Sequence, residues 1–130
     1  MTASVLIVDD DPAFRAVAIE LIAACGMTVV GEADGIATGL SMAMQLKPSA
    51  ALVDVALPDG DGFALARKLS VLPWRPRVVL TSVQKDVGSP DGVRRSGAQA
   101  FVPKADLPGA PLARLLGGDE PGLATGCPQR

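Results

Sequence analysis

The 130-residue chain contains no histidine, and this absence removes several kinds of chemistry. Ser/His/Asp and Cys/His catalysis, histidine-containing metal sites and service as the histidine donor of a phosphoryl group all require an imidazole. Only 20% of the residues are charged and the net charge is −2, whereas a chain that coats DNA or RNA is strongly basic. We therefore expect a globular protein that does not bind nucleic acid directly.

The chain also has few cysteines and no segment that resembles a targeting signal. Cys25 and Cys127 are too few for a disulfide framework and too far apart for a Cys-x-x-Cys motif, which fits a reducing compartment. The N-terminus carries no basic segment, and its first apolar run, residues 5–8, stops at three aspartates. This pattern predicts neither a signal peptide nor a membrane span, so we expect a cytoplasmic protein.

Short apolar runs recur at the spacing of β-α units, with helix-length segments between them. The first predicted helix begins at an Asp11-Pro12 cap, and the next two start near Asp34 and Asp61. Gly and Pro interrupt the fourth and fifth helices, which should be short or distorted. Five strands alternating with helices predict a doubly wound α/β fold with a parallel sheet. The predicted strands are residues 5–8, 28–30, 50–53, 78–80 and 100–102.

The length of the chain suits one domain, and its composition changes near the C-terminus. We assign residues 4–116 to the domain. Residues 117–130 are rich in Gly and Pro and poor in large apolar side chains, which predicts a flexible tail. The same composition would suit a linker to a further domain.

Polar residues stand at the ends of the predicted strands, where a doubly wound sheet gathers its ligands. Asp9 and Asp10 end the first strand, Asp54 the third and Thr81 the fourth, and Lys104 follows the fifth. Two carboxylates in contact repel by about 4 kcal/mol at an effective dielectric constant near 20. The lysine offsets only one of three negative charges, so the group needs a divalent cation, and all-oxygen ligands suit Mg²⁺.

A carboxylate, a hydroxyl and an ammonium around a hard cation are suited to phosphoryl transfer. An aspartate attacks phosphorus directly as its anion, whereas a serine needs a general base, and the chain has no histidine to serve as one. There is no Walker phosphate loop and no Gly-x-Gly-x-x-Gly sequence, so a nucleotide is not the expected phosphodonor.

Four segments together resemble the receiver domain of two-component response regulators, over roughly residues 4–116. They are VLIVDDDPAFR, LVDVALPDGDGF, VVLTS and SGAQAFVPKADL. The resemblance implies a flavodoxin-like fold, in which a five-stranded parallel sheet of order 2-1-3-4-5 carries helices on both faces. It also implies a phosphorelay function, either as a stand-alone receiver or as the receiver part of a larger regulator.

By this resemblance Asp54 is the phosphoacceptor, and the two carboxylates before it help to hold Mg²⁺. Asp10 and Asp54 would bind the metal directly, together with the backbone carbonyl of Ala56, and Asp9 would hold it through water. The donor would be a phosphohistidine on a sensor histidine kinase or a histidine phosphotransfer protein.

The resemblance also assigns the residues that respond to the new phosphoryl group. Lys104 would bind a phosphoryl oxygen, Thr81 would move toward the group and hydrogen-bond to it, and Phe101 would turn inward as the switch aromatic. The output would be altered binding of an unidentified downstream protein by a monomer or a weak, phosphorylation-dependent dimer. Such a domain catalyses its own modification and turns over no metabolite, so we do not class it as an enzyme.

The sequence departs from the family pattern at several positions. Pro103 precedes Lys104 rather than following it, so we expect no cis peptide after the lysine. Phe101 has no phenolic hydroxyl, so its switching would be transmitted by packing alone. Ala56 and Val83 stand where the family tunes dephosphorylation, and neither side chain can orient water, so we expect slow self-hydrolysis.

Two other functions are compatible with these residues or with this fold. A haloacid-dehalogenase-like phosphatase also uses Asp, Thr and Lys at strand ends with Mg²⁺, and residues 9–11 contain its Asp-x-Asp. The expected residues after that motif, its late acidic motif and a cap domain are missing here. A phosphorylation-independent binding module on the same fold is the second alternative, although such a module has no reason to keep three mutually repelling acids.

Overall fold

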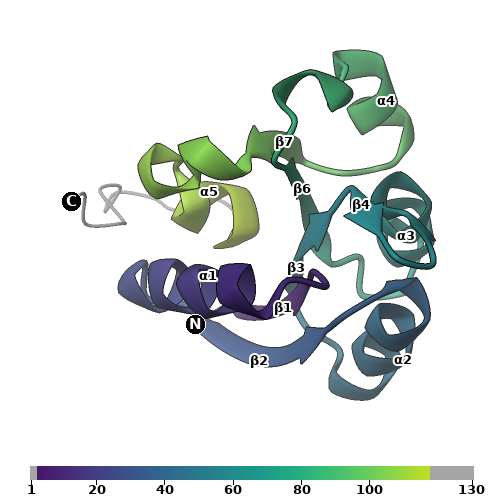
Figure 1. Cartoon of the computed structure of the whole chain (residues 1–130). Helices are drawn as coiled ribbons and strands as arrows, with labels where there is room; N and C mark the ends of the chain where they lie inside the picture. The colour runs from purple at the N-terminus through teal and green to yellow at the C-terminus, as the bar shows by residue number, and fades with distance from the viewer. Residues whose placement is uncertain (1–2, 118–130) are drawn as a thin grey trace.

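The computed structural model describes residues 3–117, and it contains a five-stranded parallel sheet (Figure 1). The strand order is β2-β1-β3-β6-β7, which confirms the predicted order 2-1-3-4-5, because two short strands interrupt the numbering. Those two, β4 and β5, form a separate antiparallel hairpin directly after β3. The strand bounds are β1 Ser4–Val8, β2 Thr28–Ala33, β3 Ala50–Asp54, β4 Ala56–Leu57, β5 Gly60–Asp61, β6 Arg77–Ser82 and β7 Ala100–Pro103.

Helices cover both faces of the sheet, as the sequence predicts (Figure 1). Helices α1 and α5 pack on one face with the 3₁₀ segment η2, and α2 and α3 pack on the other. The bounds are α1 Pro12–Ala24, α2 Ile36–Leu46, α3 Gly62–Ser70, α4 Pro90–Arg95 and α5 Leu112–Gly117, with 3₁₀ segments η1 Lys85–Val87 and η2 Lys104–Gly109. No helix within residues 3–117 is long and apolar enough to cross a membrane.

The central strands separate two apolar cores, because alternate side chains point to opposite faces. Ile7 and Leu52 lie in the core beneath α1 and α5, whereas Leu6 and Val53 lie in the core beneath α2 and α3. All five residues of β3 are buried, as expected for a strand that is covered on both faces. The end of β3 is therefore a central, sheltered position.

Side-chain caps explain where the helices begin. Asp11 accepts a hydrogen bond from Ala13 N at 3.0 Å, and Pro12 follows as the first helical residue, as predicted. Asp61 caps α3 in the same way through Phe63 N at 2.8 Å. The second helix, predicted to start near Asp34, begins at Ile36 after Gly35.

The two weakly predicted helices are indeed short, at six residues each. Gly117, which we expected to begin the tail, is the last residue of α5. The rest of the predicted tail, residues 118–130, lies outside the described residues.

Candidate functional site

The ends of β1 and β3 bring three carboxylates together. One carboxylate oxygen each from Asp9, Asp10 and Asp54 lies within 4.8 Å of the others. Asp9 is 1% exposed and Asp54 is 6% exposed, whereas Asp10 is open to solvent. The two buried acids are neighbours because β1 and β3 pair in parallel, so that their carboxyl ends meet at one edge of the sheet.

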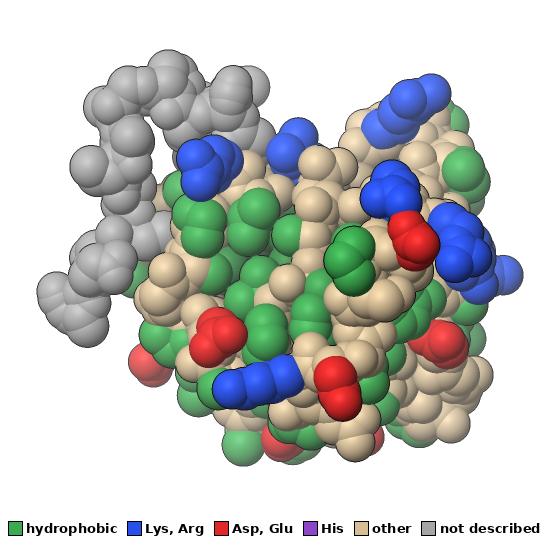
Figure 2. All heavy atoms as spheres, turned by 90° about the horizontal axis from the view of Figure 1, so that it is seen from above, with side chains coloured by type: hydrophobic (Ala, Val, Ile, Leu, Met, Phe, Trp, Pro, Cys, Tyr) green, Lys and Arg blue, Asp and Glu red, His purple; other side chains and the backbone are tan. Residues whose placement is uncertain are grey.

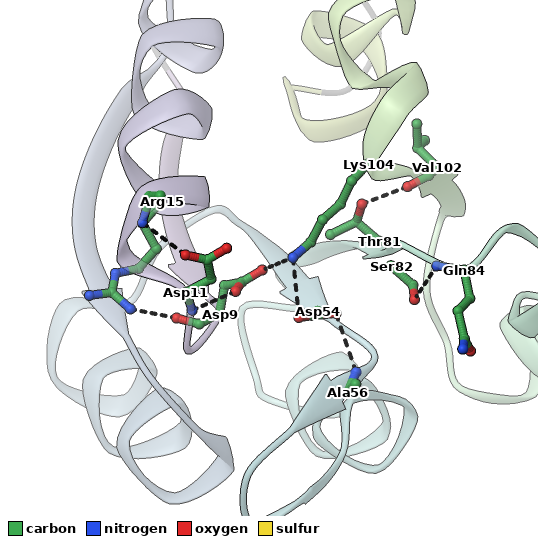
Figure 3. A network of polar contacts seen from close by, with 11 residues as sticks. Asp9, Asp11, Arg15, Asp54, Ala56, Thr81, Ser82, Gln84, Val102 and Lys104 are labelled. Atoms are coloured by element: carbon green, nitrogen blue, oxygen red, sulfur yellow. Dashed lines mark hydrogen bonds and ion pairs between the residues drawn. The ribbon is translucent and has the colours of Figure 1, made fainter.

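Lys104 contacts both buried carboxylates. It follows β7, and its Nζ lies 2.8 Å from Asp9 Oδ2 and 3.4 Å from Asp54 Oδ2 (Figure 3). Its side chain is only 14% exposed, and its Nζ also lies 4.1 Å from the centre of the Phe14 ring in α1. The structure thus groups Asp9, Asp10, Asp54 and Lys104, four of the residues that the sequence analysis singled out.

The charges in this group shift two pKa values. Burial, and then the negative charge of Asp9, raise the pKa of Asp54 above its usual value, although Lys104 and the N–H of Ala56 act against this. Burial acts to lower the pKa of Lys104, but its contacts with Asp9 and Asp54 outweigh that effect and raise it. The lysine therefore stays charged, and it does not fully offset the repulsion between the carboxylates.

Asp9 is fixed by its own loop. Its Oδ1 accepts a hydrogen bond from Asp11 N at 2.9 Å, and its backbone carbonyl accepts one from Arg15 Nη1 at 2.6 Å. Arg15 is itself held by Glu32, with 2.9 Å between Nε and Oε1. Asp9 Oδ2 is buried and forms an ion pair with the Lys104 ammonium at 2.8 Å.

This arrangement suits a hard cation. The two buried carboxylates share the single ammonium of Lys104, and a metal ion would supply the further positive charge that they lack. The donors are all oxygens, and their combined charge exceeds what Lys104 compensates. The residues present therefore fit a divalent ion such as Mg²⁺.

Ala56 lies just beyond Asp54, at the start of the β4–β5 hairpin. Its N–H donates to Asp54 Oδ1 at 3.2 Å, which orients that carboxylate. The tip of the hairpin is also held, because Asp59 accepts hydrogen bonds from Ile36 N at 2.8 Å and Ala37 N at 3.1 Å. The hairpin that follows Asp54 therefore supplies the missing cap of α2.

Thr81 and Phe101 lie on the β6 and β7 side of the site. The hydroxyl of Thr81 donates to the Val102 carbonyl at 2.6 Å and is fully buried (Figure 3). Phe101 is half-buried, and the segment after η1 lies directly on its ring, since a Cβ added to Gly88 would come within 2.2 Å of Phe101 Cγ. In this structure the threonine is thus bonded to the neighbouring strand rather than to Asp54.

A hollow of about 290 Å³ lies away from the carboxylates, between α3 and α4. Phe63, Arg67 and Arg95 are among its lining residues. Figure 2 shows several Lys and Arg side chains at the right of the face seen there, and others at its upper left and near its lower edge. None of the site residues that the sequence predicts lines this hollow.

Sequence reasoning missed three residues that shape the site. Phe14 was assigned to the core-facing side of the first helix, and it does pack against that core, but its ring also faces Lys104. Arg15 and Asp59 carried no recognisable signal, because their partners are a backbone carbonyl in one case and backbone N–H groups 22 and 23 residues away in the other.

Comparison with known proteins identifies the family. Residues 5–109 match the family model of the response regulator receiver domain. The chain belongs to this family. The DNA-binding transcriptional activator DevR/DosR of Mycobacterium tuberculosis is 37% identical over 114 residues, which cover 86% of this chain and 52% of that protein. The response regulator GacA of Pseudomonas viridiflava is 33% identical over 113 residues, 86% of this chain and 51% of that protein.

Solved structures agree with this assignment. A two-component response regulator of the LuxR family from Aurantimonas sp. has a TM-score of 0.76 at 25% identity, with 97% of this chain and 95% of that chain covered. The response regulator domain of Thermotoga maritima CheB has a TM-score of 0.70 at 25% identity, with 79% and 78% covered. The receiver domain described here spans about half the length of the two curated relatives.

Family membership settles the class of function. The chain is a receiver domain of two-component response regulators, proteins that interact with histidine kinases. Receiver domains bind Mg²⁺ at an acidic pocket, and the aspartate cluster of this chain could hold a metal ion. The phosphatase and the phosphorylation-independent module are accordingly not favoured.

Proposed function

We propose that this receiver domain accepts a phosphoryl group on Asp54 from a phosphohistidine of a sensor histidine kinase or histidine phosphotransfer protein. The observation that carries the proposal is the position of Asp54: a sheltered carboxylate at the end of the central strand, beside Asp9 and within 3.4 Å of Lys104. Asp54 suits the acceptor role better than Asp9, whose side chain is more deeply buried.

The transfer forms one bond and breaks one. A carboxylate oxygen of Asp54 attacks phosphorus, the P–N bond to the histidine breaks, and the imidazole leaves with the electron pair and takes a proton from water. The product is an acyl phosphate. Lys104 is close enough to bind a phosphoryl oxygen, so that one fixed positive charge offsets the negative charge that arrives.

The acid cluster would hold the cation that this chemistry requires. Asp10, Asp54 and the backbone carbonyl of Ala56 would bind the ion directly, and Asp9 would hold it through water. Bound Mg²⁺ would neutralise negative charge on the carboxylates and on the incoming phosphoryl oxygens. The protein contributes by holding these ligands close together before the phosphodonor arrives.

The response starts at Thr81. Phosphorylation replaces one carboxylate charge by about two negative charges on the acyl phosphate, which attracts a hydroxyl donor. Thr81 would exchange its hydrogen bond with Val102 for one with the phosphoryl group, and this would free the Phe101 side of the site to repack beneath Gly88. The changed surface would then bind a different protein partner.

We extend the proposal to the whole domain. Residues 4–116 form a cytoplasmic receiver, either stand-alone or within a longer regulator, that turns over no metabolite. Its output is a downstream protein, it binds no nucleic acid itself, and it is a monomer or a weak dimer that depends on phosphorylation.

Intact-protein mass spectrometry tests the proposal. Purified protein is incubated with acetyl phosphate with and without Mg²⁺, beside Asp54→Ala and, as a matched control, Asp59→Ala. A gain of one phosphoryl group that requires both Mg²⁺ and Asp54, and that Asp59→Ala retains, supports the proposal. If acetyl phosphate and a set of phosphorylated histidine kinases all leave the mass unchanged, the proposal is wrong.

A further inference from the structure

Lys104 has a third neighbour besides its two carboxylates. Its Nζ lies 4.1 Å from the centre of the Phe14 ring, well inside the distance of about 6 Å at which a cation is attracted to an aromatic face. In comparison, Lys47 Nζ lies 5.8 Å from the centre of the Trp74 ring. Because the Lys104 side chain is 14% exposed, its contact with the ring is shielded from water and stronger than a surface contact.

We propose that Phe14 is a positioning residue for Lys104, which its ring holds at the site while the lysine changes its anionic partner. In the structure the ammonium is paired with Asp9 and Asp54. The proposed chemistry takes both carboxylates away from it, since they become ligands of a cation and one becomes an acyl phosphate. The ring is the neighbour that stays unchanged throughout.

An aromatic ring suits this task better than another carboxylate would. Three carboxylates already repel one another here, and a fourth would increase that repulsion. A neutral ring attracts the ammonium through its quadrupole without binding a metal ion and without adding net charge. The attraction is also weak enough to let the lysine turn toward a phosphoryl oxygen.

The position of the ring is fixed independently of the lysine. Phe14 lies in the first turn of α1, whose start is set by the Asp11 cap and Pro12, and it packs against the core beneath α1. The next residue, Arg15, donates to the Asp9 carbonyl. The ring and the Asp9 backbone therefore belong to one rigid unit, and the ring defines where the ammonium can lie relative to the acids.

A direct test needs no phosphorylation. In the metal-free protein, the Lys104 side-chain protons should resonate upfield in the NMR spectrum because they lie over the face of Phe14. Phe14→Leu, which keeps an apolar side chain, should abolish this shift, and Phe14→Tyr, which keeps an aromatic face, should restore it. Lys104 resonances at ordinary positions in the unchanged protein would refute the proposal.

A kinetic test rests on the proposed function, because it measures phosphorylation of Asp54 by acetyl phosphate. Phenylalanines with one to three ring fluorines, inserted at position 14, reduce the negative charge of the ring face with little change of shape. We expect the rate to fall in steps, by about fivefold over the series, and to fall similarly in Phe14→Leu. The matched control is the same series at Phe63, on the opposite face of the sheet, where the rate should not change.

The outcomes separate the two proposals. Equal rates across the series at position 14 would overturn the role of Phe14 even if Asp54 is phosphorylated normally. If the unchanged protein accepts no phosphoryl group, the proposed function fails, and the NMR measurement alone decides whether Phe14 holds Lys104. Urea unfolding of each variant shows whether a lost signal reflects a lost contact or a lost fold.

Discussion

Replacing Gly88 by alanine should displace Phe101 and destabilise the protein. An added Cβ would lie 2.2 Å from Cγ, 2.3 Å from Cδ2 and 2.7 Å from Cδ1 of the Phe101 ring, whereas carbon atoms in contact are normally about 3.5–4.0 Å apart. The backbone at Gly88, with φ −99°, is one that alanine can adopt, so the cost is steric. We expect the free energy of unfolding to fall by about 1–3 kcal/mol, as for other overpacked cores.

Urea unfolding followed by fluorescence measures this effect, because the chain has a single tryptophan. Trp74 is hydrogen-bonded through Nε1 to the Pro48 carbonyl at 3.0 Å, so its environment changes on unfolding. The decisive comparison is a double-mutant cycle with Phe101→Ala, which opens the space that the new methyl group needs. In that background Gly88→Ala should cost almost nothing; an equal cost in both backgrounds would refute the reasoning.

Three further predictions concern the residues around the site. Thr81→Val leaves the buried Val102 carbonyl without its 2.6 Å hydrogen bond and should lower the free energy of unfolding, measured by chemical denaturation, by about 1–3 kcal/mol. Thr81→Ser keeps the hydroxyl and should keep the response to phosphorylation, which NMR spectra of the isolated protein would show. Hydrogen bonds from two backbone N–H groups lower the pKa of Asp59 below 3.8, so the stability that its carboxylate provides is present above that pH and is lost as the pH falls through the lowered value. Asp59→Asn should flatten the stability profile in this acidic range, and an unchanged profile would contradict the assignment. The acyl phosphate should decay slowly, because the side chains of Ala56 and Val83 cannot orient water; substituting a polar residue at either position should speed the decay measured by mass spectrometry.

The sequence predicts the framework of the fold well because its signals are local. Each apolar run marks a strand, although β2 at the edge of the sheet is largely exposed, and the Asp-Pro pair at residues 11–12 marks a helix start within two positions. The β4–β5 hairpin escapes prediction because each of its strands has only two residues, too few for a period to show. The cap of α2 escapes prediction for another reason: it comes from Asp59, which is distant in sequence.

The site also has parts that the sequence predicts and parts that it does not. Asp9, Asp10, Asp54 and Lys104 could be expected together, because polar residues at the ends of parallel strands meet at one edge of the sheet. The contact between Lys104 and Phe14 could not, since an aromatic residue on the inner side of a helix has the same sequence pattern whether it meets only aliphatic side chains or also a cation. Such contacts depend on how α1 packs against the segment after β7.

The hairpin that follows Asp54 is tied to two helices, and this determines when its conformational entropy is lost. Asp61 caps α3, and Asp59 caps α2, so the tip of the hairpin is ordered as soon as the domain folds. Fixing one backbone residue costs about 1–2 kcal/mol, and for this loop that cost belongs to folding and is not repeated when a reactant arrives. A phosphodonor therefore meets a loop that is already in place, and its affinity is not reduced by the need to order the loop.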